Sequence, residues 1–234
     1  MNRITTIVQA RAGSQRLPNK VMATLAGEPL LAHVLRRVKA TTTPMQVVLA
    51  IPTTQENDRL AVLGETEGVH VYRGLEDDVL ARFFWASQQV EGTEVVVRIT
   101  ADDPFKDPAL IDYAIEGFLA PYANPPQGLE LPAMLWLGGE TWPLGLDVEV
   151  FTMEALRLAH QEAADPYDRE HVTPWIKREL GCWVLKNETG HGSIRDRWTL
   201  DDEGDLAFAA DVYRRLYARN PVFGFREMVA AGYA

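Results

Sequence analysis

The most constraining feature of the sequence is an alternation of short apolar segments with amphipathic ones over the first hundred residues. Residues 4–9, 47–51, 69–72 and 95–99 are apolar and largely β-branched, which is typical of buried strands. Between them, apolar residues recur at helical spacing, in residues 30–38, 60–63 and 77–89. This alternation predicts a parallel sheet covered by helices on both faces. Ligands of such sheets bind at the carboxyl ends of the strands, so the loops after Gln9 and Ile99 are the first places to search.

The second half of the chain is less regular. Residues 121–128 hold three prolines and a glycine, which predicts an excursion from the main sheet. Helices are expected again at residues 153–163, 169–180 and 205–217, and short strands at residues 183–186 and 198–200. Asp107 and Pro108 together are suited to start a further helix.

Composition and charge exclude several classes of protein. Hydrophobic residues make up 47% of the 234 residues, which is enough for a full core in a single domain. The formal net charge of −10 repels nucleic acid and anionic membranes, so we expect neither as a partner. The lone cysteine, Cys182, permits no intramolecular disulfide, and no apolar run approaches the ~20 residues of a membrane span. With an N-terminus that resembles a strand rather than a signal peptide, these features predict a cytoplasmic protein.

The loop after the first strand concentrates positive charge in a chain that is acidic overall. Residues 9–20 are Gln-Ala-Arg-Ala-Gly-Ser-Gln-Arg-Leu-Pro-Asn-Lys. Arg11 and Arg16 can fork onto phosphate oxygens, and Lys20 adds a compact charge. Gly13 permits a tight turn whose amides, together with the Ser14 hydroxyl, can cradle an anion. The spacing fits neither a Walker A motif nor a dinucleotide fingerprint, so the alternatives are a phosphate site of another type and a solvated surface turn.

Two acidic segments can supply a site for a divalent cation. Asp102 and Asp103 follow the fourth apolar segment, and Asp201 follows residues 198–200. Carboxylates at the end of a parallel strand can hold Mg²⁺, with phosphate oxygens and water completing its coordination. The alternatives are a turn before Pro104 and a helix cap before residue 205. A basic loop opposite these carboxylates would favour a polyphosphate bound with Mg²⁺.

The basic loop resembles the signature loop of the cytidylyltransferases that make CMP-activated sugar acids, which include the acylneuraminate and 3-deoxy-manno-octulosonate enzymes. It is most similar to the branch of spore coat polysaccharide biosynthesis cytidylyltransferase-like proteins. The resemblance continues in Tyr-Arg-Gly-Leu-Glu-Asp-Asp-Val-Leu-Ala-Arg-Phe at residues 72–83, in Gly-Leu-Asp-Val-Glu-Val-Phe at residues 145–151, and in Asp-Arg-Glu-His-Val-Thr-Pro at residues 168–174. It implies an α/β fold, a mostly parallel Rossmann-like sheet flanked by helices, of the nucleotide-diphospho-sugar transferase type.

The resemblance also implies how the single domain, residues 1–234, is organised. Residues 1–120 would form the half that binds nucleotide, and residues 121–234 the half that binds the acceptor. A small excursion or dimerisation lobe would lie around residues 121–145, which makes a homodimer a candidate assembly. Asp147 and Glu149 alternate with apolar residues, which predicts a strand with both carboxylates on one face.

Roles for individual residues follow from the same resemblance. The implied nucleotide-binding residues are Ala10, Arg11, Gly13, Ser14, Arg16, Lys20, Arg73 and Gly74. Asp102 and Asp201 would be the metal ligands, and Arg11, Lys20 and Asp102 the catalytic residues. Asp147, Glu149, Arg169, Glu170 and His171 would bind the acceptor, although Arg169–His171 also suits the start of a helix. Asp103 falls at a position where relatives vary, so no role is carried over to it.

The reaction that the resemblance implies is a Mg²⁺-dependent transfer of CMP from CTP to a sugar acid or related small acceptor, with release of pyrophosphate. Its setting would be the synthesis of a cell-surface polysaccharide or glycan. Four alternatives stay open: an acceptor that bears phosphate or phosphonate, a glycosyltransferase that uses a nucleotide-sugar, a nucleotidyltransferase for UTP or GTP, and a nucleotide-binding module without activity.

Overall fold

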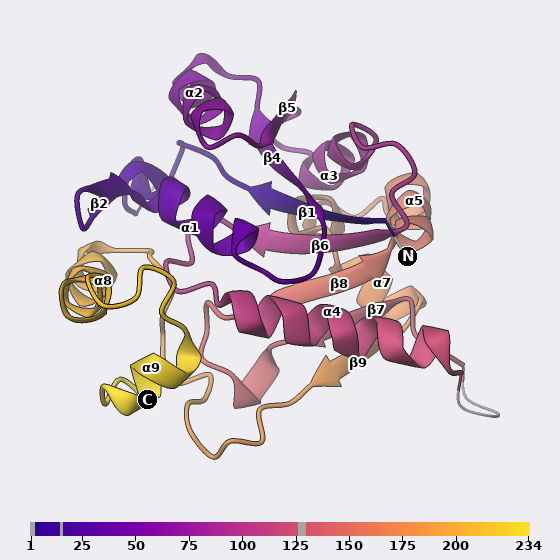
Figure 1. Cartoon of the computed structure of the whole chain (residues 1–234). Helices are drawn as coiled ribbons and strands as arrows, with labels where there is room; N and C mark the ends of the chain where they lie inside the picture. Colours follow the sequence, from indigo (N-terminus) through magenta and orange to yellow (C-terminus); the bar gives the residue numbers. More distant parts are fainter. Residues whose placement is uncertain (1–2, 15, 126–129) are drawn as a thin grey trace.

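A seven-stranded sheet forms the centre of the computed structural model, which describes residues 3–14, 16–125 and 130–234 (Figure 1). Its strands are β1 (Ile4–Gln9), β4 (Gln46–Pro52), β5 (His70–Gly74), β6 (Val95–Thr100), β7 (Met134–Leu137), β8 (Val148–Thr152) and β9 (Cys182–Leu185). Their order across the sheet is β5-β4-β1-β6-β8-β7-β9. A short antiparallel hairpin, β2 (Thr24–Leu25) and β3 (Glu28–Pro29), stands apart from it.

The strands from the first hundred residues are parallel, as the sequence predicts. β1 lies between β4 and β6 and pairs in parallel with both, and β4 pairs in parallel with β5. The strands of the second half are mixed, because β8 runs antiparallel to β6 and β7 while β9 is parallel to β7. The carboxyl ends of β1 and β6 meet, with Gln9 opposite Thr100, so their following loops leave the same edge of the sheet.

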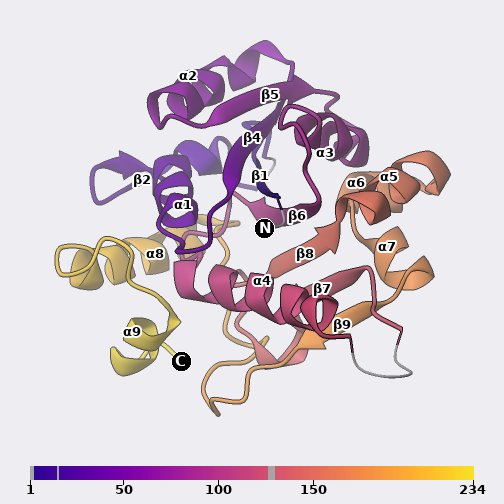
Figure 2. The ribbon, with the colours of Figure 1, turned by 45° about the vertical axis from the view of Figure 1, so that its right-hand side comes forward.

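Helices cover both faces of the sheet (Figure 2). They are α1 (Leu30–Lys39), α2 (Asp58–Thr66), α3 (Val79–Ser87), α4 (Pro108–Ala123), α5 (Met153–Glu162), α6 (Pro166–His171), α7 (Pro174–Glu179), α8 (Glu203–Leu216) and α9 (Phe225–Ala230), with 3₁₀ turns η1 (Lys20–Met22), η2 (Gln55–Asn57) and η3 (Gly139–Thr141). Val8 packs in the core that contains α1, α2, α4, α8 and α9, whereas Ile7 packs against α3, α5 and α7. Successive strand residues face opposite ways, which explains two cores from one strand. Among the described residues, no helix combines the length and the apolar character needed to cross a membrane.

Two sequence predictions about the second half are wrong. The helix expected over residues 169–180 is divided into α6 and α7, because Val172 has a φ of 72° and Pro174 then opens the first turn of α7. The strand expected at residues 198–200 is absent from the described sheet. A single bridge joins Arg197 to Leu144, and Trp198 is instead buried in the core with 2% exposure.

The proline-containing stretch partly returns to the sheet. α4 extends to Ala123, and β7 then enters the sheet between β8 and β9, an insertion that the sequence pattern does not predict. Residues 126–129 of the stretch lie outside the described residues. The dimer arm around residues 121–145 stays a prediction.

Candidate functional site

A polar cavity of about 560 Å³ opens at the carboxyl ends of β1 and β6. Its lining comes from segments that are far apart in the sequence: Gln9, Ala10, Arg11, Gly13, Ser14, Arg16, Lys20, Val21, Glu76, Thr100, Asp102 and Asp201. The structure therefore brings the basic loop and both carboxylates to one place. Because β1 and β6 are adjacent and parallel, their loops have to meet at this edge.

Lys20 joins the two carboxylates at the centre of this cavity. Its Nζ donates to Asp102 Oδ2 at 2.6 Å and to Asp201 Oδ1 at 2.8 Å, and Arg16 Nη2 lies 3.1 Å from Asp201 Oδ2. Burial lowers the pKa of Lys20, but the attraction and hydrogen bonds of both carboxylates outweigh it and hold this pKa above its ordinary value. Burial raises the pKa of Asp201, and the bonds from Lys20 more than compensate, so that carboxyl stays ionised.

The backbone of the basic loop is fixed by the segment that follows β4. The backbone amide of Ala12 donates to Oδ1 of the Asn57 side chain at 2.8 Å, and Asn57 is buried. The Ala12 carbonyl in turn accepts from the amide of Asn19 at 3.2 Å, which closes the loop just before Lys20. A Cβ on Gly13 would lie 3.0 Å from Oε1 of Glu56, which is the end of an exposed side chain that can move aside. Sequence reasoning did not identify Asn57, because its contact is with a backbone amide 45 residues away.

In each acidic pair, one aspartate lines the cavity and the next one along the chain has a structural contact. Asp202 caps α8 by accepting from the amide of Asp205 at 3.0 Å, which leaves Asp201 to face the cavity. Asp103 is buried beneath Asp102, pairs with Lys106 at 2.8 Å and accepts from the Thr100 hydroxyl. Burial and the neighbouring Asp102 raise the pKa of Asp103 to about 6 against the lowering effect of Lys106.

Asp102 and Asp201 are suitable ligands for Mg²⁺. Both are carboxylates, which hard divalent cations prefer, and they are close enough to share one ammonium group. In the described part of the chain there is no group of three or more His, Cys, Asp or Glu residues arranged to hold a metal. Two protein carboxylates with substrate phosphates and water is the usual arrangement for Mg²⁺ in phosphate chemistry, so the residues present fit this ion.

Arg73 and Gly74, expected at the nucleotide, lie beside the cavity rather than in its lining. Arg73 pairs with Asp58 at 2.6 Å and donates to the carbonyls of Thr53 and Thr54 at 3.1 Å. Gly74 leaves room for neighbouring side chains, since a Cβ there would lie 2.8 Å from Tyr72 Cε1. Glu76, two residues further on, does line the cavity and was not predicted.

The residues that the resemblance assigned to the acceptor fall into two separate groups. Arg169 pairs with Asp78 and donates to the carbonyl of His160 at 2.9 Å, which ties α6 to α3 and α5. Glu170 and His171 are exposed on α6, outside the lining of the cavity. Glu149 instead lies on β8, next to β6 and therefore close to the site.

The sequence predicted that Asp147 lies on a strand with Glu149, and this is wrong, because β8 begins only at Val148. The Asp147 carboxylate accepts from Trp136 Nε1 at 3.1 Å and from the amide of Gly145 at 3.2 Å. The turn at Gly145, with a φ of 106°, sets this position.

Glu149 is at the centre of an ion-pair network that the sequence did not reveal. It is only 5% exposed, and it lies 2.5 Å from Arg98, 2.6 Å from Lys177 and 2.9 Å from the Thr173 hydroxyl that donates to it. Burial raises the pKa of Glu149, but the two cations outweigh burial and lower it to about 2. Detecting this network requires the antiparallel register in which Arg98 faces Glu149.

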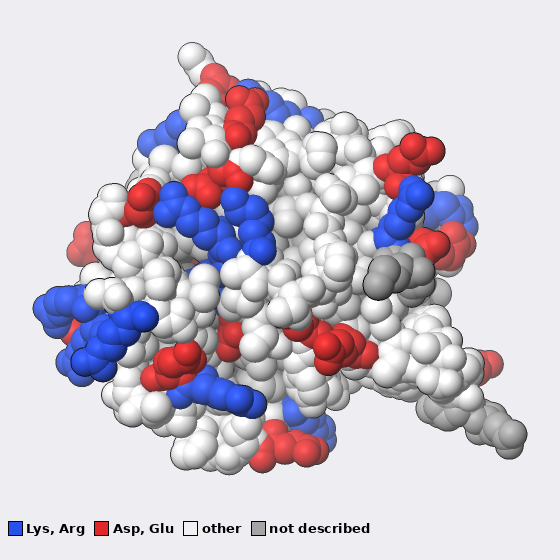
Figure 3. Space-filling view, viewed as in Figure 1, with Lys and Arg blue, Asp and Glu red and all other residues white. Residues whose placement is uncertain are grey.

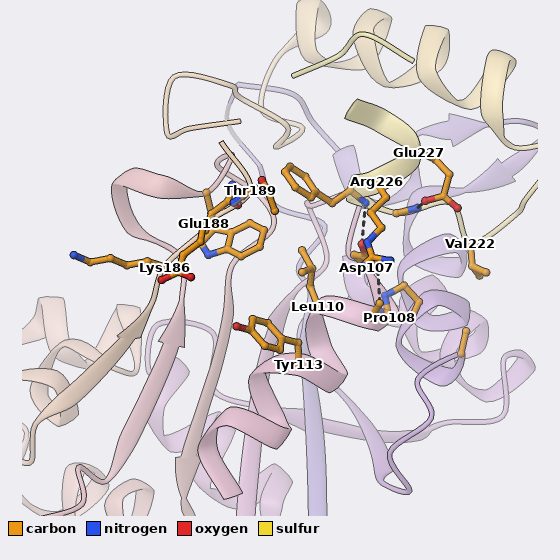
Figure 4. Close-up of a pocket in the computed structure, with 16 residues that line it drawn as sticks. Asp107, Pro108, Leu110, Tyr113, Lys186, Glu188, Thr189, Val222, Arg226 and Glu227 are labelled. Carbon is orange, nitrogen blue, oxygen red and sulfur yellow. Dashed lines mark hydrogen bonds between the residues drawn. The ribbon is translucent and has the colours of Figure 1, made fainter. Parts of the chain in front are cut away.

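A second cavity, of about 750 Å³, lies between α4, α9 and residues 186–189 (Figure 4). Apolar side chains such as Leu110, Trp142 and Phe225 contribute to its lining. Its carboxylate Asp107 accepts from the amides of Ala109 and Phe225, both at 2.8 Å, so that group serves the start of α4 and the docking of α9. This cavity is larger and has charged side chains of its own, but its lining shares no residue with that of the cavity at the ends of β1 and β6.

The polar cavity carries charges of both signs. On the face shown in Figure 3, lysine and arginine side chains are interspersed with aspartate and glutamate. In the lining of the polar cavity, three cations face three carboxylates, so their formal charges cancel. A polyanion that binds there gains from a divalent cation that neutralises the carboxylates.

Comparisons with known proteins point to one family. The cytidylyltransferase family profile matches residues 5–231. The spore coat polysaccharide biosynthesis protein SpsF of Bacillus subtilis is 34% identical over 73% of this chain and 72% of its own length. The 3-deoxy-manno-octulosonate cytidylyltransferase of Geobacter sulfurreducens is 33% identical over 53% of this chain and 46% of its own length. The solved structure of a cytidylyltransferase from Leptospira borgpetersenii has a similar fold, with a TM-score of 0.87 and 24% identity over 99% of this chain and 94% of that one.

Proposed function

This chain belongs to the cytidylyltransferase family, and from that membership we propose that it transfers CMP from CTP to a sugar acid or related acceptor, with release of pyrophosphate. The observation that most directly supports the proposal is the polar cavity in which Arg11, Arg16 and Lys20 face Asp102 and Asp201. It is a site for a polyphosphate bound with a divalent cation, built where parallel α/β sheets bind their ligands.

The basic loop would hold the triphosphate. Arg11 and Arg16 would bind phosphate oxygens, and the Gly13 amide and the Ser14 hydroxyl would add donors, because the Ser14 amide already donates to the Ala12 carbonyl at 3.0 Å. Fixed donors that meet developing charge on the departing pyrophosphate lower the barrier without having to reorganise. The Asn57–Ala12 bond keeps the loop in place for this task.

Mg²⁺ would be held by Asp102 and Asp201, and when bound it supplies positive charge beside the phosphates. Lys20 now lies between these carboxylates, and together with Arg16 on Asp201 it balances their two charges. On nucleotide binding, Lys20 would release the carboxylates and bind phosphate oxygens, so its charge serves the resting and the loaded site in turn.

The choice of acceptor class rests on the relatives. One is named a 3-deoxy-manno-octulosonate cytidylyltransferase and another a spore coat polysaccharide biosynthesis protein, which supports a sugar acid destined for a cell-surface glycan. The acceptor oxygen would attack the α-phosphorus of CTP in line with the departing pyrophosphate, and holding both substrates in that alignment supplies a large part of the rate.

The proposal is tested by measuring pyrophosphate release with CTP, UTP or GTP, with Mg²⁺, against a panel of sugar acids. We expect release with CTP and at least one acid, and thermal stabilisation by CTP with Mg²⁺. Transfer from a nucleotide-sugar without pyrophosphate would instead show a glycosyltransferase. Stabilisation by CTP without pyrophosphate from any acceptor would show a binding module and refute the proposed reaction.

A further inference from the structure

We propose that Lys106 and Asp103, an ion pair buried beside the nucleotide cavity, are positioning residues that fix the Asp102 carboxylate opposite Asp201. Neither member of the pair lines the cavity, so both act through the backbone of the turn that follows β6. The inference rests on the proposed function, because it concerns how that site holds its divalent cation. It adds a role for two residues to which the family resemblance assigns none.

The two charged groups of the pair are shielded from solvent. The side chain of Lys106 is 1% exposed and that of Asp103 is 6% exposed, and Lys106 Nζ lies 2.8 Å from Asp103 Oδ2. Lys106 Nζ also donates to the carbonyl of Asp147 at 2.5 Å, and Asp103 also accepts from the Thr100 hydroxyl. One buried ammonium therefore ties the turn after β6 to the residue that precedes β8.

The backbone of Asp102 is held from two directions. Its carbonyl accepts from the amide of Leu200 at 2.9 Å, which places the residue before Asp201 directly against it. The next residue along the chain is Asp103, whose side chain is held by Lys106. These two anchors together determine where the Asp102 carboxylate lies relative to that of Asp201. Releasing Asp103 would remove one anchor and allow the separation of the two carboxylates to vary.

The chain around Lys106 is itself anchored, so the ammonium has a fixed support. The carbonyl of Pro104 accepts from the Tyr213 hydroxyl at 2.8 Å, and the carbonyl of Lys106 accepts from Arg37 Nη1 at 3.3 Å. Both Tyr213 and Arg37 are 1% exposed and belong to helices packed in the core. Because this support is buried and bonded on both sides, the position of the ammonium sets that of the Asp103 carboxylate.

A contribution to stability does not by itself explain a buried ion pair. Removing both charges from a protein interior often leaves stability unchanged, whereas removing one of them is strongly destabilising because the other stays buried without a partner. The position of a catalytic group matters far more, since a shift of about 1 Å can lower a rate about a hundredfold. A variant without either charge therefore separates the two roles, because it should keep its stability and lose the geometry of the site.

The test compares the single variants Asp103→Asn and Lys106→Met with the double variant that carries both changes. Arg36→Met combined with Glu67→Gln is the matched control, because the Glu67 side chain is 8% exposed, lies 2.6 Å from Arg36 and is outside the cavity lining. Unfolding midpoints are measured for each protein alone, with CTP and EDTA, and with CTP and Mg²⁺. Pyrophosphate release with the sugar acid that wild type uses best gives kcat. Asp103→Asn, which keeps the shape of the side chain, carries the comparison if the double variant does not fold.

We expect each single variant to unfold about 10 °C below wild type and the double variant to recover most of that loss. The double variant should still show a kcat about a hundredfold low, and it should lose the extra stabilisation that Mg²⁺ adds to CTP while keeping the stabilisation by CTP with EDTA. The control should match wild type in kcat and in both stabilisations.

The outcomes separate this inference from the proposed function. A wild-type kcat or a wild-type Mg²⁺ effect in the folded double variant would overturn the positioning role and leave CMP transfer standing. Equal midpoints with Mg²⁺ and with EDTA in wild type would remove the metal site and the role of the pair with it. If wild type releases no pyrophosphate with any acid, CMP transfer is refuted, and the Mg²⁺ effect on the midpoints still decides the role of the pair.

Discussion

Replacing Lys20 by methionine should have opposite effects on metal binding and on turnover. The Lys20 ammonium lies 2.6 Å from Asp102 and 2.8 Å from Asp201, where a shared divalent ion would otherwise bind. In the absence of nucleotide, an ion at the proposed site would therefore have to break both bonds first. Methionine has a similar length but no charge, so it removes this competition.

The size of the effect follows from the two broken bonds. A hydrogen bond to a charged group contributes about 1.5–3 kcal/mol, and the lower value suits carboxylates whose side chains are 33% and 21% exposed. Two such bonds amount to about 3 kcal/mol, or roughly a hundredfold in affinity. Pyrophosphate release should meanwhile slow about a hundredfold, because Lys20 no longer binds the phosphates.

The assay is a titration of nucleotide-free protein with Mn²⁺, with the free ion measured by electron paramagnetic resonance. Lys39→Met is the matched control, since this lysine pairs with Glu67 away from the site. Adding Asp102→Asn to Lys20→Met should abolish the gain in affinity. If Lys20→Met binds Mn²⁺ no more tightly than wild type, the ammonium does not occupy the position of the ion and the reasoning is wrong.

Three further predictions concern other parts of the site. Asp102→Asn and Asp201→Asn should each lower the rate of pyrophosphate release about a hundredfold while leaving the unfolding midpoint within a few degrees; near-normal turnover would remove that residue from the metal site. Asn57→Ala leaves the buried Ala12 amide without a partner, so the free energy of unfolding should fall by about 1–3 kcal/mol and the KM for CTP should rise; an unchanged KM would separate the bond from loop position. The pKa of Glu149 is about 2 when folded, below its ordinary value, so its ion pairs contribute fully above about pH 4.5 and are lost as the pH falls towards 2. Urea unfolding from pH 7 to 2 should show a loss of about 3 kcal/mol over that window that Glu149→Gln lacks, and identical profiles would contradict the assignment.

The sequence determines the elements of the first half because their signals are local. Periods of two and of about 3.6 residues are visible in any short window, and they place β1 at residues 4–9 as the structure does. The carboxyl ends of parallel strands meet at one edge of a sheet, which explains why the basic loop and Asp102 could be expected there. Only the structure shows that β1 and β6 are neighbours. The same local patterns miss β7, because its apolar run of four residues is too short to show a period and follows an irregular segment.

Tertiary structure alone decided which side chains meet. Lys20 contacts Asp102 and Asp201, which are 82 and 181 residues away, and no local pattern encodes such a contact. Glu149 faces Arg98 only because β8 enters the sheet antiparallel to β6 in one particular register. Register depends on packing summed over both cores, and a shift of one residue would turn Glu149 to the opposite face. The residue types in the sequence therefore indicate which chemical groups are present, whereas long-range packing determines which of them are in contact.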